Sequence, residues 1–104
     1  MSYHQSKWNN RAIKLWDLAT GREIATLSGH TDRVSAVTFS SDGKTLISGS
    51  WDKTIKLWKI NNTQEICTLK GHSDEVMSIA ISPDGKTIIS GNADYFIKIW
   101  QQID

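Results

Sequence analysis

Hydrophobic and polar residues alternate in short runs along most of this chain. In "TIKLW" at 54–58, Ile55 and Leu57 fall on one side of an extended segment, and Lys56 and Trp58 fall on the other. This two-residue period is typical of β-strands and differs from the 3.6-residue spacing of amphipathic helices. The pattern therefore predicts an all-β chain.

The breaks between these runs have the chemistry of tight turns. In "SPDG" at 82–85, Pro83 sets φ for the second turn position, Asp84 suits the third, and Gly85 can adopt a left-handed backbone. The segment "SSDG" at 40–43 repeats the pattern without the proline. The alternation and the turns together predict four strands in the first complete set, at residues 34–39, 45–50, 54–58 and 65–69.

The whole pattern returns after 42 residues. When residues 17–58 are placed over residues 59–100 without a gap, 20 of the 42 positions are identical. "GHTDRV" at 29–34 returns as "GHSDEV" at 71–76, and "IKLW" at 13–16 returns at 55–58. Such a period indicates stacked structural repeats. We therefore divide the chain into a partial unit at 1–28, a complete unit at 29–70 and a second unit at 71–104.

Composition narrows the possible partners. The 104 residues have a formal net charge of +1, with 38% hydrophobic and 22% charged residues, which is ordinary for a globular protein. Nothing in this balance attracts nucleic acid or a membrane surface, and no apolar run is long enough to span a bilayer. Cys67 has no partner for a disulfide, so we expect a reducing, cytoplasmic location. The histidines and Cys67 lack metal-ligand spacing, and we expect no metal and no cofactor.

These motifs resemble the WD-repeat β-propeller family over essentially the whole chain. The Gly-His pair, the Ser-Pro-Asp-Gly turn, "SGSWD" or "SGNAD", and "IKLW" recur in the family's order. The Trp-Asp dipeptide that names the family survives at its family position only as Trp16-Asp17, since Trp51-Asp52 stands at a different place in the repeat. Asn10 stands in the partial unit where Asp52 and Asp94 stand in the others.

The resemblance implies propeller blades, each a four-stranded antiparallel sheet. One whole blade would occupy 34–69, and the inner three strands of another would lie within 76–100. The outer half of a third would comprise 12–17 and 22–28. The expected molecule is an incomplete propeller with nine strands, in which the second unit lacks its outer strand.

A histidine with a serine and an aspartate could form a hydrolase triad, but this trio occurs twice at the same spacing. A duplicated catalytic centre is unusual, whereas every blade must satisfy the same buried polar groups, and no G-x-S-x-G nucleophile motif is present. By resemblance to the family's hydrogen-bonded tetrad, the histidine would link the aspartate to the serine and through it to a tryptophan. The two expected tetrads are His30, Ser48, Asp52 and Trp58, and His72, Ser90, Asp94 and Trp100.

With no catalytic centre expected, function should lie at surface positions that vary between the repeats. The resemblance places such positions on the top face of the propeller, beside the first strand and before the turn aspartate. Trp51 is the foremost candidate because tryptophan is enriched at interface hot spots, although packing of its ring against a neighbouring loop is an equal alternative. The expected partner-binding residues are Trp51, Arg33, Ser35, Glu75, Met77, Ala93 and Asn9.

The preferred function is a non-catalytic scaffold segment that binds a protein or peptide, with neither nucleic acid nor membrane as a partner. Because about three blades are needed for stability, either additional blades or self-association should cover the open sheets. In one alternative, residues 22–104 form a two-blade unit whose strand at 22–28 completes another copy, so that three or four chains close a six- or eight-bladed ring. In the other, the chain is the tail of a longer propeller. A less favoured hypothesis is a hydrolase-like enzyme with Arg33, Glu75 and His4 on the top face.

Overall fold

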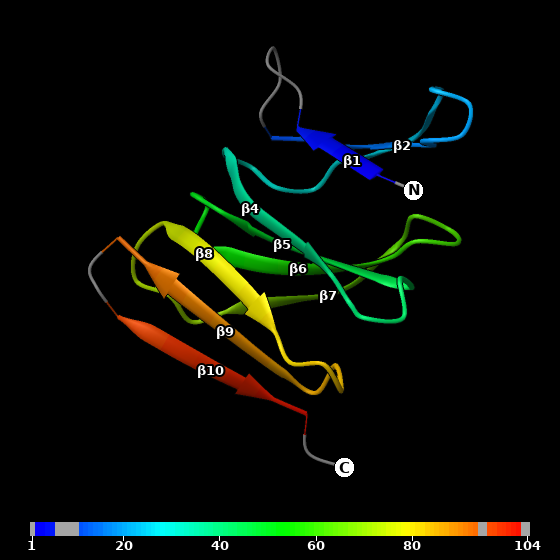
Figure 1. Cartoon of the computed structure of the whole chain (residues 1–104). Helices are drawn as coiled ribbons and strands as arrows, with labels where there is room; N and C mark the ends of the chain where they lie inside the picture. Colours follow the sequence, from blue (N-terminus) through cyan, green and yellow to red (C-terminus); the bar gives the residue numbers. More distant parts are fainter. Residues whose placement is uncertain (1, 6–10, 94–95, 103–104) are drawn as a thin grey trace.

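The structure is a computed structural model that describes residues 2–5, 11–93 and 96–102. Its strands form three antiparallel sheets that follow one another along the chain (Figure 1). The all-β fold predicted from the sequence is confirmed. Within the described residues no helix is long and apolar enough to cross a bilayer.

The middle sheet contains four strands in the order of the sequence. They are β4 (Val34–Phe39), β5 (Thr45–Ser50), β6 (Thr54–Lys59) and β7 (Glu65–Lys70). The last sheet contains β8 (Val76–Ile81), β9 (Thr87–Asn92) and β10 (Ile97–Gln101). These bounds agree closely with the strands expected from alternation and turn chemistry.

The first sheet corrects the expected count of nine strands. It consists of β1 (Ser2–Gln5), β2 (Ile13–Trp16) and β3 (Glu23–Leu27), so the described residues form ten strands, and the expected outer half blade has a third strand. β1 pairs antiparallel with β2 and thereby satisfies the backbone groups along that edge. Its sequence, "SYHQ", lacks the apolar alternation that marked the other strands.

The turns have the geometry that their residues favour. The amide of Gly43 donates to the carbonyl of Ser40 at 2.9 Å, and Gly85 donates to Ser82 at the same distance. Both glycines have positive φ, 73° and 76°, where a side chain would strain the backbone. Asp42 and Asp84 accept hydrogen bonds from the serine that opens each turn. The same turn chemistry thus connects the first two strands in both repeats.

The hydrophobic core lies between the sheets, in two layers. Ile13, Leu15 and Leu27 of the first sheet pack against Val34, Leu46 and Trp58 of the middle sheet. Ile47 and Ile55, on the opposite face of the middle sheet, pack against Val76 and Ile88 of the last sheet. Adjacent residues of a strand point to opposite faces, so both faces of the middle sheet are covered.

Close stacking of the middle and last sheets depends on a glycine in β5. A Cβ atom at Gly49 would lie 2.6 Å from side-chain atoms of both Val76 and Ile79. The inner strands β4 and β8 also meet through the Ser35 hydroxyl, which donates to the carbonyl of Val76. The Gly49 contact and the Ser35 hydrogen bond hold the middle and last sheets close together, near the turns that carry the candidate functional residues.

Candidate functional site

The first set of repeated polar residues lies between the first and middle sheets. His30 is brought there by the connection between β3 and β4, Ser48 by β5, and Asp52 by the turn before β6. The Nδ1 atom of His30 is 2.8 Å from an Asp52 carboxylate oxygen, and its Nε2 atom is 2.7 Å from the Ser48 hydroxyl. The indole N–H of Trp58 donates to the same hydroxyl at 2.9 Å. The structure therefore brings all four residues into one hydrogen-bonded chain.

The direction of each bond follows from donor chemistry. The carboxylate of Asp52 can only accept, so the proton of the His30 ring resides on Nδ1, and Nε2 is left to accept from Ser48. Burial lowers the pKa of His30 despite the attraction of Asp52, which agrees with a neutral ring. The Ser48 hydroxyl consequently donates to His30 while it accepts from Trp58.

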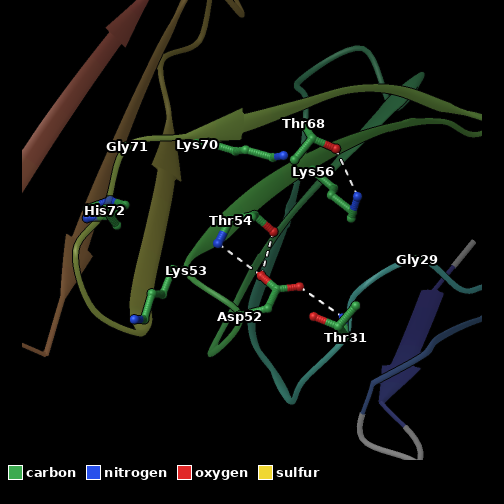
Figure 2. Close-up of a pocket in the computed structure, with 10 residues that line it drawn as sticks. All are labelled: Gly29, Thr31, Asp52, Lys53, Thr54, Lys56, Thr68, Lys70, Gly71 and His72. Carbon is green, nitrogen blue, oxygen red and sulfur yellow. Dashed lines mark hydrogen bonds between the residues drawn. The ribbon is translucent and has the colours of Figure 1, made fainter.

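Asp52 is held by several donors in the turn. Burial by itself would raise its pKa, but hydrogen bonds from Thr54 and His30 and from the amide of Thr31 outweigh that effect and lower the pKa. The carboxylate is therefore charged at neutral pH, and it ties the connection before β4 to the turn before β6 (Figure 2).

The second set repeats this geometry between the middle and last sheets. His72 Nε2 lies 2.5 Å from the Ser90 hydroxyl, to which the indole N–H of Trp100 donates at 2.9 Å. Burial, followed by the nearby charge of Lys98, lowers the pKa of His72. Asp94, the expected fourth member, lies outside the described residues, and the buried Nδ1 atom of His72 has no hydrogen-bond partner among the described ones.

The histidine, serine and aspartate of the first set have the order of contacts of a catalytic triad, but their environment differs. Ser48 and Ser90 have no exposed surface, and each hydroxyl already accepts a hydrogen bond from an indole N–H. A substrate carbonyl could not approach such an oxygen without separating the sheets. The arrangement is suited to holding turns and strands together, because a buried polar group left unpaired costs about 1–3 kcal/mol.

Two of the expected binding residues meet at the same end of the middle sheet. The Arg33 guanidinium lies 4.4 Å from the centre of the Trp51 ring, a cation–π contact. The amide of Trp51 donates to the carbonyl of Arg33 at 2.9 Å, which aligns the two residues. Arg33 is exposed and Trp51 is half-buried. Part of Trp51 is therefore packed within the molecule and part is accessible at the surface, so its burial agrees with both alternatives for this residue.

The other expected binding residues are more scattered. The Ser35 hydroxyl is directed inward, to the carbonyls of Gly49 and Val76. Glu75 is half-buried beside Asp74, and a hydrogen bond with Asp74 is the main cause of its raised pKa. Met77 and Ala93 are exposed, and Asn9 lies outside the described residues.

Two residues that support the first tetrad were not predicted by comparing the repeats of the sequence. The Thr54 hydroxyl donates to Asp52 at 2.5 Å, and the Ser50 hydroxyl connects the carbonyl of Arg33 to the amide of Asp52. The equivalent positions in the next repeat are Phe96 and Asn92. Because neither residue recurs after 42 positions, the repeat itself gave no signal for them.

A comparison with protein-family models agrees with the repeats seen in the sequence. The family model described as "WD domain, G-beta repeat" matches residues 21–59 and 63–101, which is most of the chain. The two matches follow each other at the period seen in the sequence.

Several relatives match single segments of the chain. It is 47% identical over 47 residues to guanine nucleotide-binding protein subunit beta-5b of Danio rerio, a match of 45% of this chain and 12% of that protein. It is 50% identical over 42 residues to a periodic tryptophan protein 2 homolog of Schizosaccharomyces pombe, covering 40% of this chain and 5% of the relative. It is 40% identical over 58 residues to small ribosomal subunit protein RACK1 of Caenorhabditis elegans, covering 47% and 18%. The matches thus span less than a fifth of each relative's length.

Proposed function

Because the chain belongs to the WD-repeat family, we propose that it is a scaffold segment that binds a protein or peptide partner and catalyses no reaction. The repeated tetrads are assigned to structure, since their serines are fully buried and hydrogen-bonded. Binding is assigned to the end of the sheets where Arg33 covers Trp51. In this account the domains are the units 1–28, 29–70 and 71–104, and the protein acts in the cytoplasm.

The Arg33–Trp51 pair is the observation that carries this proposal. Tryptophan and arginine are the residue types most enriched at interface hot spots, and the cation–π contact holds them in one geometry before a partner arrives. Such preorganisation reduces the ordering cost of binding. In the next repeat Glu75 stands at the position of Arg33 and the exposed Met77 stands at the position of Ser35, and both extend the surface along the same end.

Affinity capture from a cell extract, with bound proteins quantified by mass spectrometry, tests this assignment. We compare the unmodified chain with Arg33→Glu and with Lys44→Glu, which makes the same charge change in the exposed turn at the opposite end of β4 and β5. Proteins retained by the unmodified chain and by Lys44→Glu should be lost with Arg33→Glu. Equal capture by all three, at equal melting temperatures, contradicts the proposal.

Self-association into a six- or eight-bladed ring is the second candidate, and the last sheet favours it. Ile97 and Ile99 of β10 are 71% and 66% exposed, whereas the equivalent residues of the middle sheet are the fully buried Ile55 and the half-buried Leu57. Contiguous exposed apolar residues mark association surfaces. Exchange of the strand at 22–28 between copies would require β3 to leave β2, with which it pairs in its own chain.

Light scattering distinguishes these candidates. A stable species of three or four chains supports the ring, and a monomer at high concentration contradicts it. The scaffold proposal predicts partner capture in either case, so the two candidates fail independently.

A further inference from the structure

A cavity of about 430 Å³ opens between the middle and last sheets, beside the β8–β9 turn. This turn lies at the end of the last sheet opposite to Glu75, which precedes β8. The volume falls within the roughly 300–1,000 Å³ of ligand pockets. Both sheets contribute apolar residues to the lining, namely Leu57 of β6, Leu69 of β7, Ile88 of β9 and Trp100 of β10. The polar residues of the lining, Lys86, Gln101 and Gln102, are exposed.

The repeat shows what fills the equivalent place between the first and middle sheets. Moving back by 42 residues from Leu57, Leu69, Ile88, Trp100 and Gln102 gives Leu15, Leu27, Leu46, Trp58 and Ile60. The first four of these equivalents belong to the buried core of that junction, and Ile60 packs against that core. At the first junction, a branched aliphatic side chain of the chain itself therefore covers the apolar residues.

Gln102 takes the place of Ile60 at the second junction and is held in the same way. The amide of Ile60 donates to the carbonyl of Lys44 at 3.0 Å, and the amide of Gln102 donates to the carbonyl of Lys86 at 2.9 Å. Ile60 is half-buried, whereas Gln102 is exposed. The backbone is thus repeated, but a polar side chain that favours water stands where the first junction has an aliphatic one.

The apolar residues around the cavity are correspondingly less buried than their equivalents. Trp58 is 2% exposed and Leu15 is fully buried, whereas Trp100 and Leu57 are half-buried. Trp100 and Leu57 also pack against the core cluster that joins the middle and last sheets, so the cavity is continuous with that contact. An apolar group placed in the cavity would extend the contact and remove apolar surface from water.

We propose that this cavity binds the branched aliphatic side chain of an isoleucine on a partner peptide. The occupant is identified by Ile60, which has this chemistry and packs against the equivalent residues of the first junction. The inference rests on the proposed scaffold function and adds to it a second contact, at the end of the sheets opposite to Arg33 and Trp51.

Titration of the whole chain, followed by the chemical shifts of the indole N–H groups, tests the site. The probes are acetyl-Gly-Ile-Gly-amide and acetyl-Gly-Gln-Gly-amide. The isoleucine tripeptide should shift the indole of Trp100, which lines the cavity, and leave that of Trp58 unchanged, because Ile60 already covers the equivalent place. The glutamine tripeptide should shift neither indole.

Two matched variants test the role of Gln102. Gln102→Ile supplies the side chain that the first junction has, so it should weaken binding of the isoleucine tripeptide at least about tenfold and raise the melting temperature. Gln64→Ile makes the same change at an exposed position outside the cavity, and it should alter the binding by less than about twofold.

Several results overturn the proposal. Among them are equal shifts of the Trp58 and Trp100 indoles, equal shifts of Trp100 by the two tripeptides, and unweakened binding by Gln102→Ile. A shift of the Trp100 indole on concentrating the chain without peptide would assign the cavity to a second copy. Binding that becomes tenfold tighter with Ile103→Ser, a position outside the described residues, would assign it to the chain's own end.

The test also separates this site from the proposed scaffold surface. Arg33→Glu should leave the titration unchanged, because Arg33 does not line the cavity. Loss of the Trp100 shift together with intact, Arg33-dependent partner capture refutes the cavity alone. An intact titration with capture that does not depend on Arg33 refutes the scaffold surface alone.

Discussion

Replacement of Ser48 by alanine tests whether the first tetrad stabilises the fold. The change removes one fully buried hydroxyl and adds no bulk. It leaves the indole N–H of Trp58 and the Nε2 atom of His30 without their partner, because both bond to that hydroxyl. Each unpaired buried group costs about 1–3 kcal/mol, so we expect the free energy of unfolding to fall by about 2–4 kcal/mol. That is a large share of the roughly 5–15 kcal/mol typical of a small domain.

Urea unfolding followed by tryptophan fluorescence measures this loss. Ser28→Ala removes an exposed hydroxyl and should change the free energy of unfolding by less than about 0.5 kcal/mol. Trp58→Phe removes the donor instead of the acceptor. Because both replacements act on one hydrogen bond, a double-mutant cycle should give a coupling energy of about 1 kcal/mol or more. A Ser48→Ala loss no larger than that of Ser28→Ala, or strict additivity in the cycle, would refute the reasoning.

Three further predictions concern pH, packing and association. The pKa values of His30 and His72 are lowered from 6.5 by burial, so the unfolded chain binds more protons. The free energy of unfolding should therefore be greatest above about pH 6.5 and fall as the pH drops through the folded-state pKa values. Urea unfolding at several pH values measures this, and a flat profile between pH 7.5 and 5.5 would contradict it. Gly49→Ala places a Cβ atom 2.6 Å from Val76 and Ile79 and should cost about 1–3 kcal/mol in the same assay, whereas no loss would mean that the sheets are less closely packed. Ile99→Lys adds a charge to the exposed face of β10 and should lower the sedimentation-derived mass of any oligomer, and an unchanged mass would place the contact elsewhere.

The strands of the two complete units could be predicted because their sequence signals agree. Alternation, Ser-Asp-Gly turns and the 42-residue period all indicate the same boundaries, and β4 and β5 coincide with the expected ranges. The contacts of His30 with Ser48 and Asp52 could likewise be expected, because the resemblance relates residues that are distant in sequence.

The strand β1 of the first sheet could not be predicted from these sequence signals. β1 is polar, and its position depends on the edge that β2 offers rather than on its own pattern. His4 pairs with Lys14, whereas Lys56 pairs with Ser48, so the register also differs from that of the middle sheet. A repeat of 42 residues cannot predict a register that departs from the repeat.

The exchange of the indole N–H protons of Trp58 and Trp100 with solvent tests the central claim most directly. If the repeated histidine, serine and tryptophan sets hold the sheets together, both protons should exchange as slowly as the amides of β5 and β9, because each is released only when the sheets open. Exchange of either indole proton at the rate of an exposed tryptophan, while those amides remain protected, would contradict the account.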